Sequence, residues 1–188
     1  AIAYKHDFAE AHNNLGSALN DFGRTQDAIQ SFKKALIYKP DYPRVLFNLA
    51  LTFKEVGNKK LSLKMIEKAL KLSPQWSDAH LELSRLKKYK KNDPQIPLVH
   101  DLVSNDEVGL SDLINYNFTL AKIYEDLEDY QKQFKFLNEA NKLRKKESGY
   151  YFDKDINLFS NIKESFKSPP SILDHSEINS EDIKPIFI

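Results

Sequence analysis

The 188-residue sequence contains no cysteine. Disulfide bonds, thiolate zinc sites and cysteine nucleophiles are therefore excluded. The sequence also lacks a surplus of either charge, because 28 lysines and arginines face 27 aspartates and glutamates, for a formal net charge of +1. A dedicated nucleic-acid-binding domain usually carries a marked excess of basic residues, so this balance argues against nucleic acid as a partner.

Long apolar runs are missing as well. No stretch approaches the roughly 20 apolar residues of a membrane-spanning helix, and no signal peptide opens the chain. The five histidines include no pair spaced i, i+4 and no metal-binding motif. The sequence therefore predicts no catalytic residue, no metal site, no cofactor and no membrane contact. A soluble cytoplasmic protein is the expected class.

The sequence does contain a 34-residue pattern, which is written twice between residues 9 and 74. Residues one period apart match in size and type, and the pairs are Leu15 and Leu49, Gly23 and Gly57, Phe32 and Ile66, Ala35 and Ala69, and Pro40 and Pro74. A fixed period of this length is the signature of a repeat array. With 41% hydrophobic residues, such an array has enough apolar surface for a continuous core.

These residues resemble the tetratricopeptide repeat (TPR) pattern. Its signature positions are filled in the two copies by Leu15, Gly16, Leu19, Ala28, Phe32, Ala35 and Pro40, and by Leu49, Ala50, Phe53, Ser62, Ile66, Ala69 and Pro74. The resemblance implies an all-α fold, a TPR-type right-handed α-α superhelix (solenoid) of about four helix pairs plus a capping helix. It says little about activity, because this family is a scaffold.

Each repeat is expected to form two antiparallel helices. Helical periodicity predicts them at residues 9–22, 26–38, 42–56, 59–72, 76–89, 94–104, 111–127 and 130–146. Small residues at Gly16 and Ala28 should let the first two helices approach closely, and Gly23 should end the first. The predicted division is a tail of a preceding repeat at 1–8, repeats at about 9–42, 43–76, 77–113 and 114–147, a capping helix at 153–167, and a linker with the start of a truncated following domain at 168–188.

The end of the chain resembles a second, more specific arrangement. An amphipathic helix is predicted at residues 155–167 with Asp153 as its N-cap, followed by an acidic linker and an apolar strand at 185–188. This order resembles the N-terminal TPR half of bacterial TPR–sulfotransferase fusions, cut before the phosphosulfate-binding loop. The resemblance implies that this chain alone is not an enzyme, although a full-length protein would be one. An ordinary repeat protein with an apolar end is the alternative.

In TPR arrays the first helix of each pair lines a concave groove that captures extended peptides or helices. The resemblance therefore implies partner-binding residues at Asn13, Asn14, Ser17, Asp21, Arg44, Phe47, Asn48, Leu51, Glu82, Arg85, Phe118 and Lys122, with Leu81 and Glu125 beside them. Some of the apolar members have the alternative of packing onto neighbouring helices. A clamp for a terminal carboxylate is disfavoured, because Asp78 and Glu82 stand where it needs cations.

The sequence favours a protein–protein interaction scaffold that binds a peptide or partner protein in the concave groove. The alternative is the substrate-recruiting N-terminal region of a sulfotransferase, and a homo-oligomer stays open. The basic runs at 87–91 and 142–146 are interpreted as charges at helix C-termini, where positive charge is mildly favourable, and contact with a polyanion is the alternative.

Overall fold

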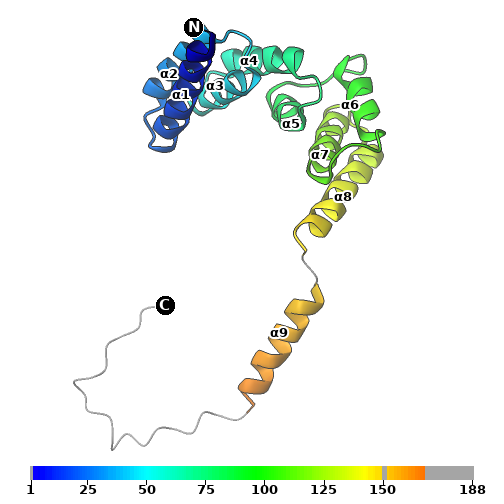
Figure 1. The fold of residues 1–188 in the computed structure, drawn as a ribbon. Helices are drawn as coiled ribbons and strands as arrows, with labels where there is room; N and C mark the ends of the chain where they lie inside the picture. Colours follow the sequence, from blue (N-terminus) through cyan, green and yellow to red (C-terminus); the bar gives the residue numbers. More distant parts are fainter. Residues whose placement is uncertain (1, 150–151, 168–188) are drawn as a thin grey trace, which may run out of the picture. The chain divides into compact units, whose positions relative to one another are not determined.

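The computed structural model describes residues 2–149 and 152–167, with side chains at 8–149 and 155–167. All regular secondary structure in these ranges is helical, which confirms the all-α prediction (Figure 1). The helices are α1 (Ile2–Asp21), α2 (Thr25–Tyr38), α3 (Pro43–Glu55), α4 (Lys59–Leu72), α5 (Ser77–Leu86), α6 (Gln95–Val103), α7 (Leu110–Asp126), α8 (Tyr130–Glu147) and α9 (Phe152–Ser165).

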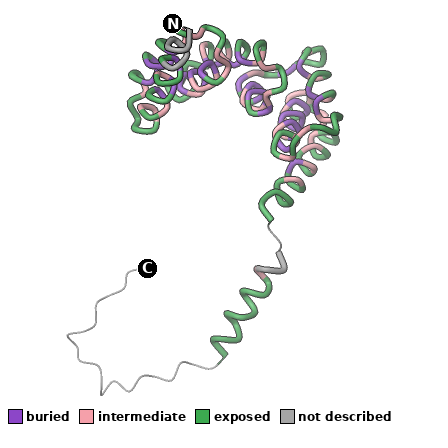
Figure 2. The backbone as a smooth tube through the Cα atoms, viewed as in Figure 1, coloured by how far each residue is buried: buried purple, intermediate pink, exposed green. Residues whose placement is uncertain are grey.

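The chain divides into two units, residues 1–147 and 148–188. In the first unit α1 packs against α2, α3 against α4, and α7 against α8, while α2 meets α3 and α4 meets α5 at the junctions between pairs. Figure 2 shows that the buried residues of this unit lie where its helices face one another. The second unit contributes α9 to the described residues.

The repeated local signals act as the sequence predicts. Gly23 and Gly57 adopt the left-handed conformation, with φ of 73° and 75°, directly after α1 and α3. Glycine reaches this conformation without steric cost, so the chain can leave each helix and reverse direction into the next one. Gly16 allows the predicted close approach of α1 and α2, since a Cβ there would lie 2.6 Å from Cε1 of Phe32.

The third repeat departs from the pattern of packed pairs. α5 ends at Leu86, before the predicted end at residue 89, and both α5 and α6 pack mainly against α7. The cause is Tyr89, which is 3% exposed and joins the apolar cluster of α6 and α7. Its backbone N–H donates to Oδ2 of Asp126 at 3.1 Å, which holds the segment after α5 away from helical geometry. A residue predicted to end a helix is therefore part of the core.

The first helix begins earlier than predicted. α1 starts at Ile2 and passes without a break through His6, where the two later copies have Pro40 and Pro74. Because histidine keeps its backbone N–H and lacks the pyrrolidine ring by which proline clashes with the preceding turn, nothing ends the helix there. The assignment of residues 1–8 to a preceding repeat, like the repeat boundaries, stays a prediction.

One apolar position differs between the two copies, and one predicted cap needs correction. Leu15 is 50% exposed although its equivalent Leu49 is 3% exposed, since Leu49 packs against α2 and the described residues hold no helix before α1. α9 begins at Phe152, so Asp153 lies in its first turn and is not the N-cap. Capping by α9 stays a prediction, and the predicted linker and strand at 168–188 lie outside the described residues.

Candidate interaction surface

Side-chain hydrogen bonds link the first helices of successive pairs. Between α1 and α3, Nδ2 of Asn48 donates to Oδ1 of Asn13 at 3.0 Å, and Nδ2 of Asn20 donates to Oε2 of Glu55 at 2.9 Å. Asn13 is only 5% exposed, so its amide serves mainly this junction. The two predicted asparagines thus bind one another and hold α1 beside α3.

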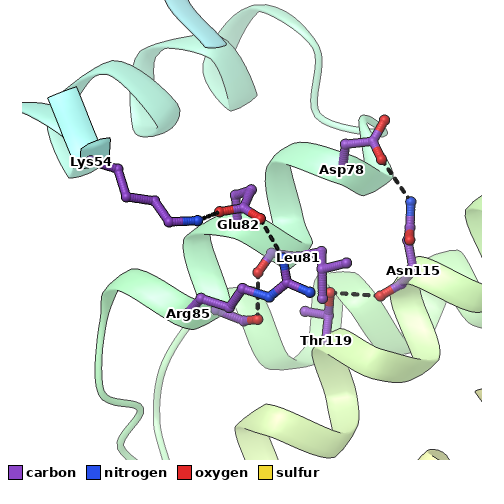
Figure 3. A network of polar contacts seen from close by, with 8 residues as sticks. Lys54, Asp78, Leu81, Glu82, Arg85, Asn115 and Thr119 are labelled. Carbon is purple, nitrogen blue, oxygen red and sulfur yellow. Dashed lines mark hydrogen bonds and ion pairs between the residues drawn. The ribbon is translucent and has the colours of Figure 1, made fainter. Parts of the chain in front are cut away.

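The junction between α3 and α5 is ionic. Nζ of Lys54 lies 2.6 Å from Oε2 of Glu82, and Arg85 pairs with the other oxygen of the same carboxylate (Figure 3). The Glu82 side chain is 12% exposed, and both of its oxygens are occupied. Glu82, predicted as a partner-binding residue, is placed to fasten α3 to α5.

The junction between α5 and α7 uses an amide and a carboxylate. Nδ2 of Asn115 donates to Oδ1 of Asp78 at 2.9 Å (Figure 3). The same nitrogen lies 3.2 Å from Oγ of Ser77. Asp78 also accepts from the indole N–H of Trp76 at 3.2 Å. Polar side chains therefore link α1 to α3, α3 to α5 and α5 to α7.

The remaining predicted residues differ in how much surface they offer. Asn14, Asp21 and Arg44 are exposed, while Ser17, Phe47, Asn48 and Leu51 are half-buried. The ring of Phe47 packs on that of Trp76 with centroids 4.7 Å apart, and it contacts the apolar cluster between α3, α4 and α5. Phe47 therefore contributes to packing as well as to the surface, which is the alternative that the sequence left open for its apolar neighbours.

Three predicted residues meet in one small pocket between α5, α7 and α8. Its volume is about 180 Å³ and its lining, called the cationic pocket below, consists of Leu81, Ser84, Arg85, Phe118, Lys122 and Arg144. The guanidinium carbon of Arg144 lies 4.6 Å from the centroid of the Phe118 ring. Such a cation–π contact positions the guanidinium without neutralising its charge.

Lys122 keeps its positive charge in this pocket. Its Nζ donates to Oδ1 of Asp126 at 2.8 Å and to Oε2 of Glu125 at 2.6 Å. These hydrogen bonds stabilise the ammonium form and raise the pKa of Lys122 above its ordinary value. The side chain is therefore a permanent cation in the lining of this pocket.

Arg144, Ser84, Lys54 and Asn115 were not predicted. Arg144 stands in the basic run at 142–146, whose place at a helix end suggested mere decoration. Its contact with Phe118 joins residues 26 positions apart and depends on the antiparallel packing of α7 and α8. No spacing within a single helix signals such a contact.

A second hollow lies among α4, α5 and α6, where the pairing of helices breaks down. It has a volume of about 450 Å³, with apolar walls that include Leu70, Leu83 and Leu98. At its edge His80 is 1% exposed and is therefore part of the core. His12, at the equivalent position of the first copy, is half-buried and stacks on Tyr38.

The buried polar groups beside this hollow form one chain of hydrogen bonds. Nε2 of His80 lies 2.7 Å from the carbonyl oxygen of Pro74, and its Nδ1 lies 2.9 Å from Nε2 of Gln95. Since the carbonyl can only accept, the ring proton sits on Nε2 and Nδ1 accepts from the Gln95 amide. The hydroxyl of Tyr89 donates to Oε1 of Gln95 at 2.7 Å. Burial lowers the pKa of His80 and favours this neutral form.

Neither a metal site nor a membrane span occurs in the described ranges, 2–149 and 152–167. These ranges hold no group of three or more histidine, aspartate or glutamate side chains placed to bind a metal ion. Nor do they contain a helix that combines the length and the apolar character needed to cross a membrane.

Comparison with known families identifies the repeats. Residues 16–57 match the family described as TPR repeat, and residues 43–75 and 114–147 match the tetratricopeptide repeat family. The third repeat, where the helix pairing breaks down, falls largely between these matches. No curated protein sequence is similar enough to this chain to count as a relative.

Solved structures share the fold at low sequence identity. A crystal structure of MamA is 20% identical, with a TM-score of 0.59 over 76% of this chain and 81% of that one. MamA from Desulfovibrio magneticus RS-1 is 18% identical, with a TM-score of 0.57 over 73% of this chain and 76% of that one. A putative kinesin light chain from Podospora anserina with TPR-like repeats is 13% identical, with a TM-score of 0.58 over 76% and 77% of the two chains. These similarities establish the α solenoid as the fold.

Proposed function

Because this chain contains tetratricopeptide repeats, we propose that it is a protein–protein interaction scaffold that binds an extended peptide or partner protein across α1, α3, α5 and α7. One observation carries the proposal most directly. Polar side chains join these four helices at all three junctions, so the predicted binding residues lie on one continuous framework. A rigid framework lowers the entropic cost of binding, because little of the surface needs to be ordered when the partner arrives.

The composition of this surface also supports binding. The predicted binding residues include exposed polar groups at Asn14, Asp21 and Arg44 and half-buried apolar groups at Leu51 and Phe118. Recognition surfaces commonly combine a few aromatic or arginine anchors with surrounding polar contacts. The proposed groove has both elements. In addition, Lys54 and Arg85 pair with the carboxylate of Glu82, which would otherwise repel acidic groups of a partner.

A selection experiment tests the proposal. The full chain is used to select peptides from a randomised library, and the affinity of the recovered peptides is measured by fluorescence anisotropy. We expect the double variant Phe47→Ala with Asn48→Ala to lose binding. Because Phe47 also packs on Trp76, the exposed pair Asn14→Ala with Arg44→Ala serves as a second groove variant that leaves the core intact.

The matched control is Lys88→Ala, an exposed residue in the segment after α5 and outside the groove. The proposal requires binding to fall by about tenfold or more in both groove variants, which is on the order of 1.4 kcal/mol, and to stay unchanged in the control. Equal loss in the control, or full binding by both groove variants, would show that the peptide docks elsewhere.

A second candidate function follows from the end of the chain. The order of α9, an acidic linker and an apolar segment at 185–188 supports the proposal that this chain is the substrate-recruiting region of a sulfotransferase. The coding sequence after Ile188 tests it. A glycine-rich stretch with a Ser/Thr-Gly-Thr ending would support the fusion, since such a loop cradles phosphate groups with its backbone amides. A stop codon or an unrelated segment would refute it.

A further inference from the structure

We propose that the cationic pocket receives the carboxylate of an aspartate or glutamate side chain from the partner peptide. The inference rests on the proposed function and names the chemistry of one position in the bound peptide. Its starting observation is the lining itself, in which Arg85, Lys122 and Arg144 converge with no acidic residue among them. A lining with three basic side chains and no acidic one is complementary to negative charge, as far as its cations are not already paired.

The three cations differ in how much of their capacity is already used. Arg85 pairs with Glu82, and the side chain of Lys122 donates to two carboxylates, which leaves one of its three ammonium hydrogens available. Arg144 instead lies over the Phe118 ring, and no carboxylate of the described residues forms an ion pair with it. Arg144 therefore supplies the charge that an incoming carboxylate meets first.

The acids near the pocket do not cancel this attraction. Glu82, Glu125 and Asp126 lie outside the lining, and each is bonded to a lysine or arginine. These acids pair with Arg85 and Lys122 of the lining and offset part of their charge, so Arg144 is the lining cation whose charge an incoming carboxylate meets.

The size of the pocket indicates what kind of molecule carries the carboxylate. Its volume of about 180 Å³ is below the range of roughly 300 to 1,000 Å³ that pockets for small molecules and cofactors occupy. One side chain of a larger partner fits such a space. Leu81 and Phe118 form an apolar wall against which the methylene groups of an aspartate or glutamate can pack.

The position of the pocket agrees with this assignment. Leu81 and Arg85 belong to α5 and Phe118 and Lys122 to α7, the same two helices that form the last junction of the proposed groove. A peptide that follows the groove along α1, α3, α5 and α7 reaches the pocket near one end. The acidic residue should therefore lie toward one end of the bound peptide, separated from the residues that contact Asn14 and Arg44.

The experiment uses the full chain and a randomised decapeptide library as the probe. We expect the selected peptides to be enriched in aspartate or glutamate at one position. Arg144→Gln should weaken the binding of these peptides by about tenfold, the effect of losing one charge-assisted hydrogen bond. The same variant should leave unchanged the weaker binding of peptides in which that acid is replaced by its amide.

Charge reversal provides a sharper version of the test. With Arg144→Glu, the enriched residue at that position should change from acidic to basic. The control is Lys142→Glu, which also reverses a positive charge, two residues earlier on α8. The Lys142 side chain is 75% exposed and outside the pocket lining. Far-UV circular dichroism checks that all variants keep their helices, and Arg144→Gln remains informative if the reversed variant fails to fold.

The outcomes separate this inference from the proposed function. Peptides that bind the groove without any acidic preference, or whose preference is unaffected by Arg144→Gln, would overturn the inference and leave the scaffold proposal standing. Failure of the wild-type chain to select any peptide would overturn both. Displacement of the acidic peptide by a single-stranded oligonucleotide, at a concentration as low as that of the peptide, would show a general polyanion site and overturn the peptide assignment.

Discussion

Gly16→Ala tests how closely α1 and α2 approach, and the structure sets the sign of its effect. The new Cβ would lie 2.6 Å from Cε1 and 2.7 Å from Cδ1 of Phe32, whereas carbon atoms pack best at about 3.5 to 4.0 Å. Phe32 is 1% exposed within the apolar cluster between α2 and α3, so its ring is enclosed by packed side chains. The helices or the ring must therefore shift.

Two effects of opposite sign decide the magnitude. Overpacking of a core typically costs about 1 to 3 kcal/mol, whereas alanine is better than glycine inside a helix by about 1 kcal/mol. We expect a net loss of about 1 kcal/mol in the free energy of unfolding. In the background Phe32→Leu the ring is absent, so Gly16→Ala should stabilise that chain by up to about 1 kcal/mol.

The assay is urea unfolding followed by far-UV circular dichroism, for the wild type, the two single variants and the double variant. The coupling energy between residues 16 and 32 should be about 1 to 3 kcal/mol. Gly23→Ala is the control for a glycine substitution without a clash. No atom lies within 4 Å of the position that its new Cβ would take, so only its φ of 73° makes alanine unfavourable there. A wild-type stability for Gly16→Ala, or a coupling near zero, would refute the close approach.

Two further predictions concern the buried chain of hydrogen bonds beside α5. Burial lowers the pKa of His80 in the folded chain, so the unfolded chain binds more protons below about pH 6.5, and the free energy of unfolding should fall as pH falls through that value. Urea midpoints at about pH 7.5 and 5.5 should show this loss of stability. His80→Gln should reduce the loss, and part of it should remain because burial also lowers the pKa of His100. A pH dependence unchanged by His80→Gln would contradict the assignment. Tyr89→Phe leaves Oε1 of Gln95 without its donor and should cost about 1 to 2 kcal/mol in the same assay, whereas Tyr130→Phe, at a tyrosine that is 66% exposed, should cost almost nothing; equal losses would argue against a buried hydrogen bond.

The sequence alone determined the repeat and the helices that it encodes. The pairs Gly23 with Gly57 and Pro40 with Pro74 mark the same turns in two copies, and α4 begins and ends at the residues predicted for it. Such signals are local, since a glycine after a helix or apolar residues at helical spacing act within a few turns of chain. The close approach at Gly16 was also readable, because Gly16 and Ala28 are small residues on the two helices of one pair.

The tertiary structure decided which side chains are left for a partner. Tyr89 looked like the end of a helix but is buried by residues of α6 and α7, and Glu82 looked available but holds Lys54 and Arg85. Arg144 looked like decoration of a helix end but completes the cationic pocket against Phe118. The physical reason is the same in each case. Periodicity reports the environment along one helix, whereas the use of a charge or a ring depends on distances of a few ångströms between helices that are far apart in the sequence.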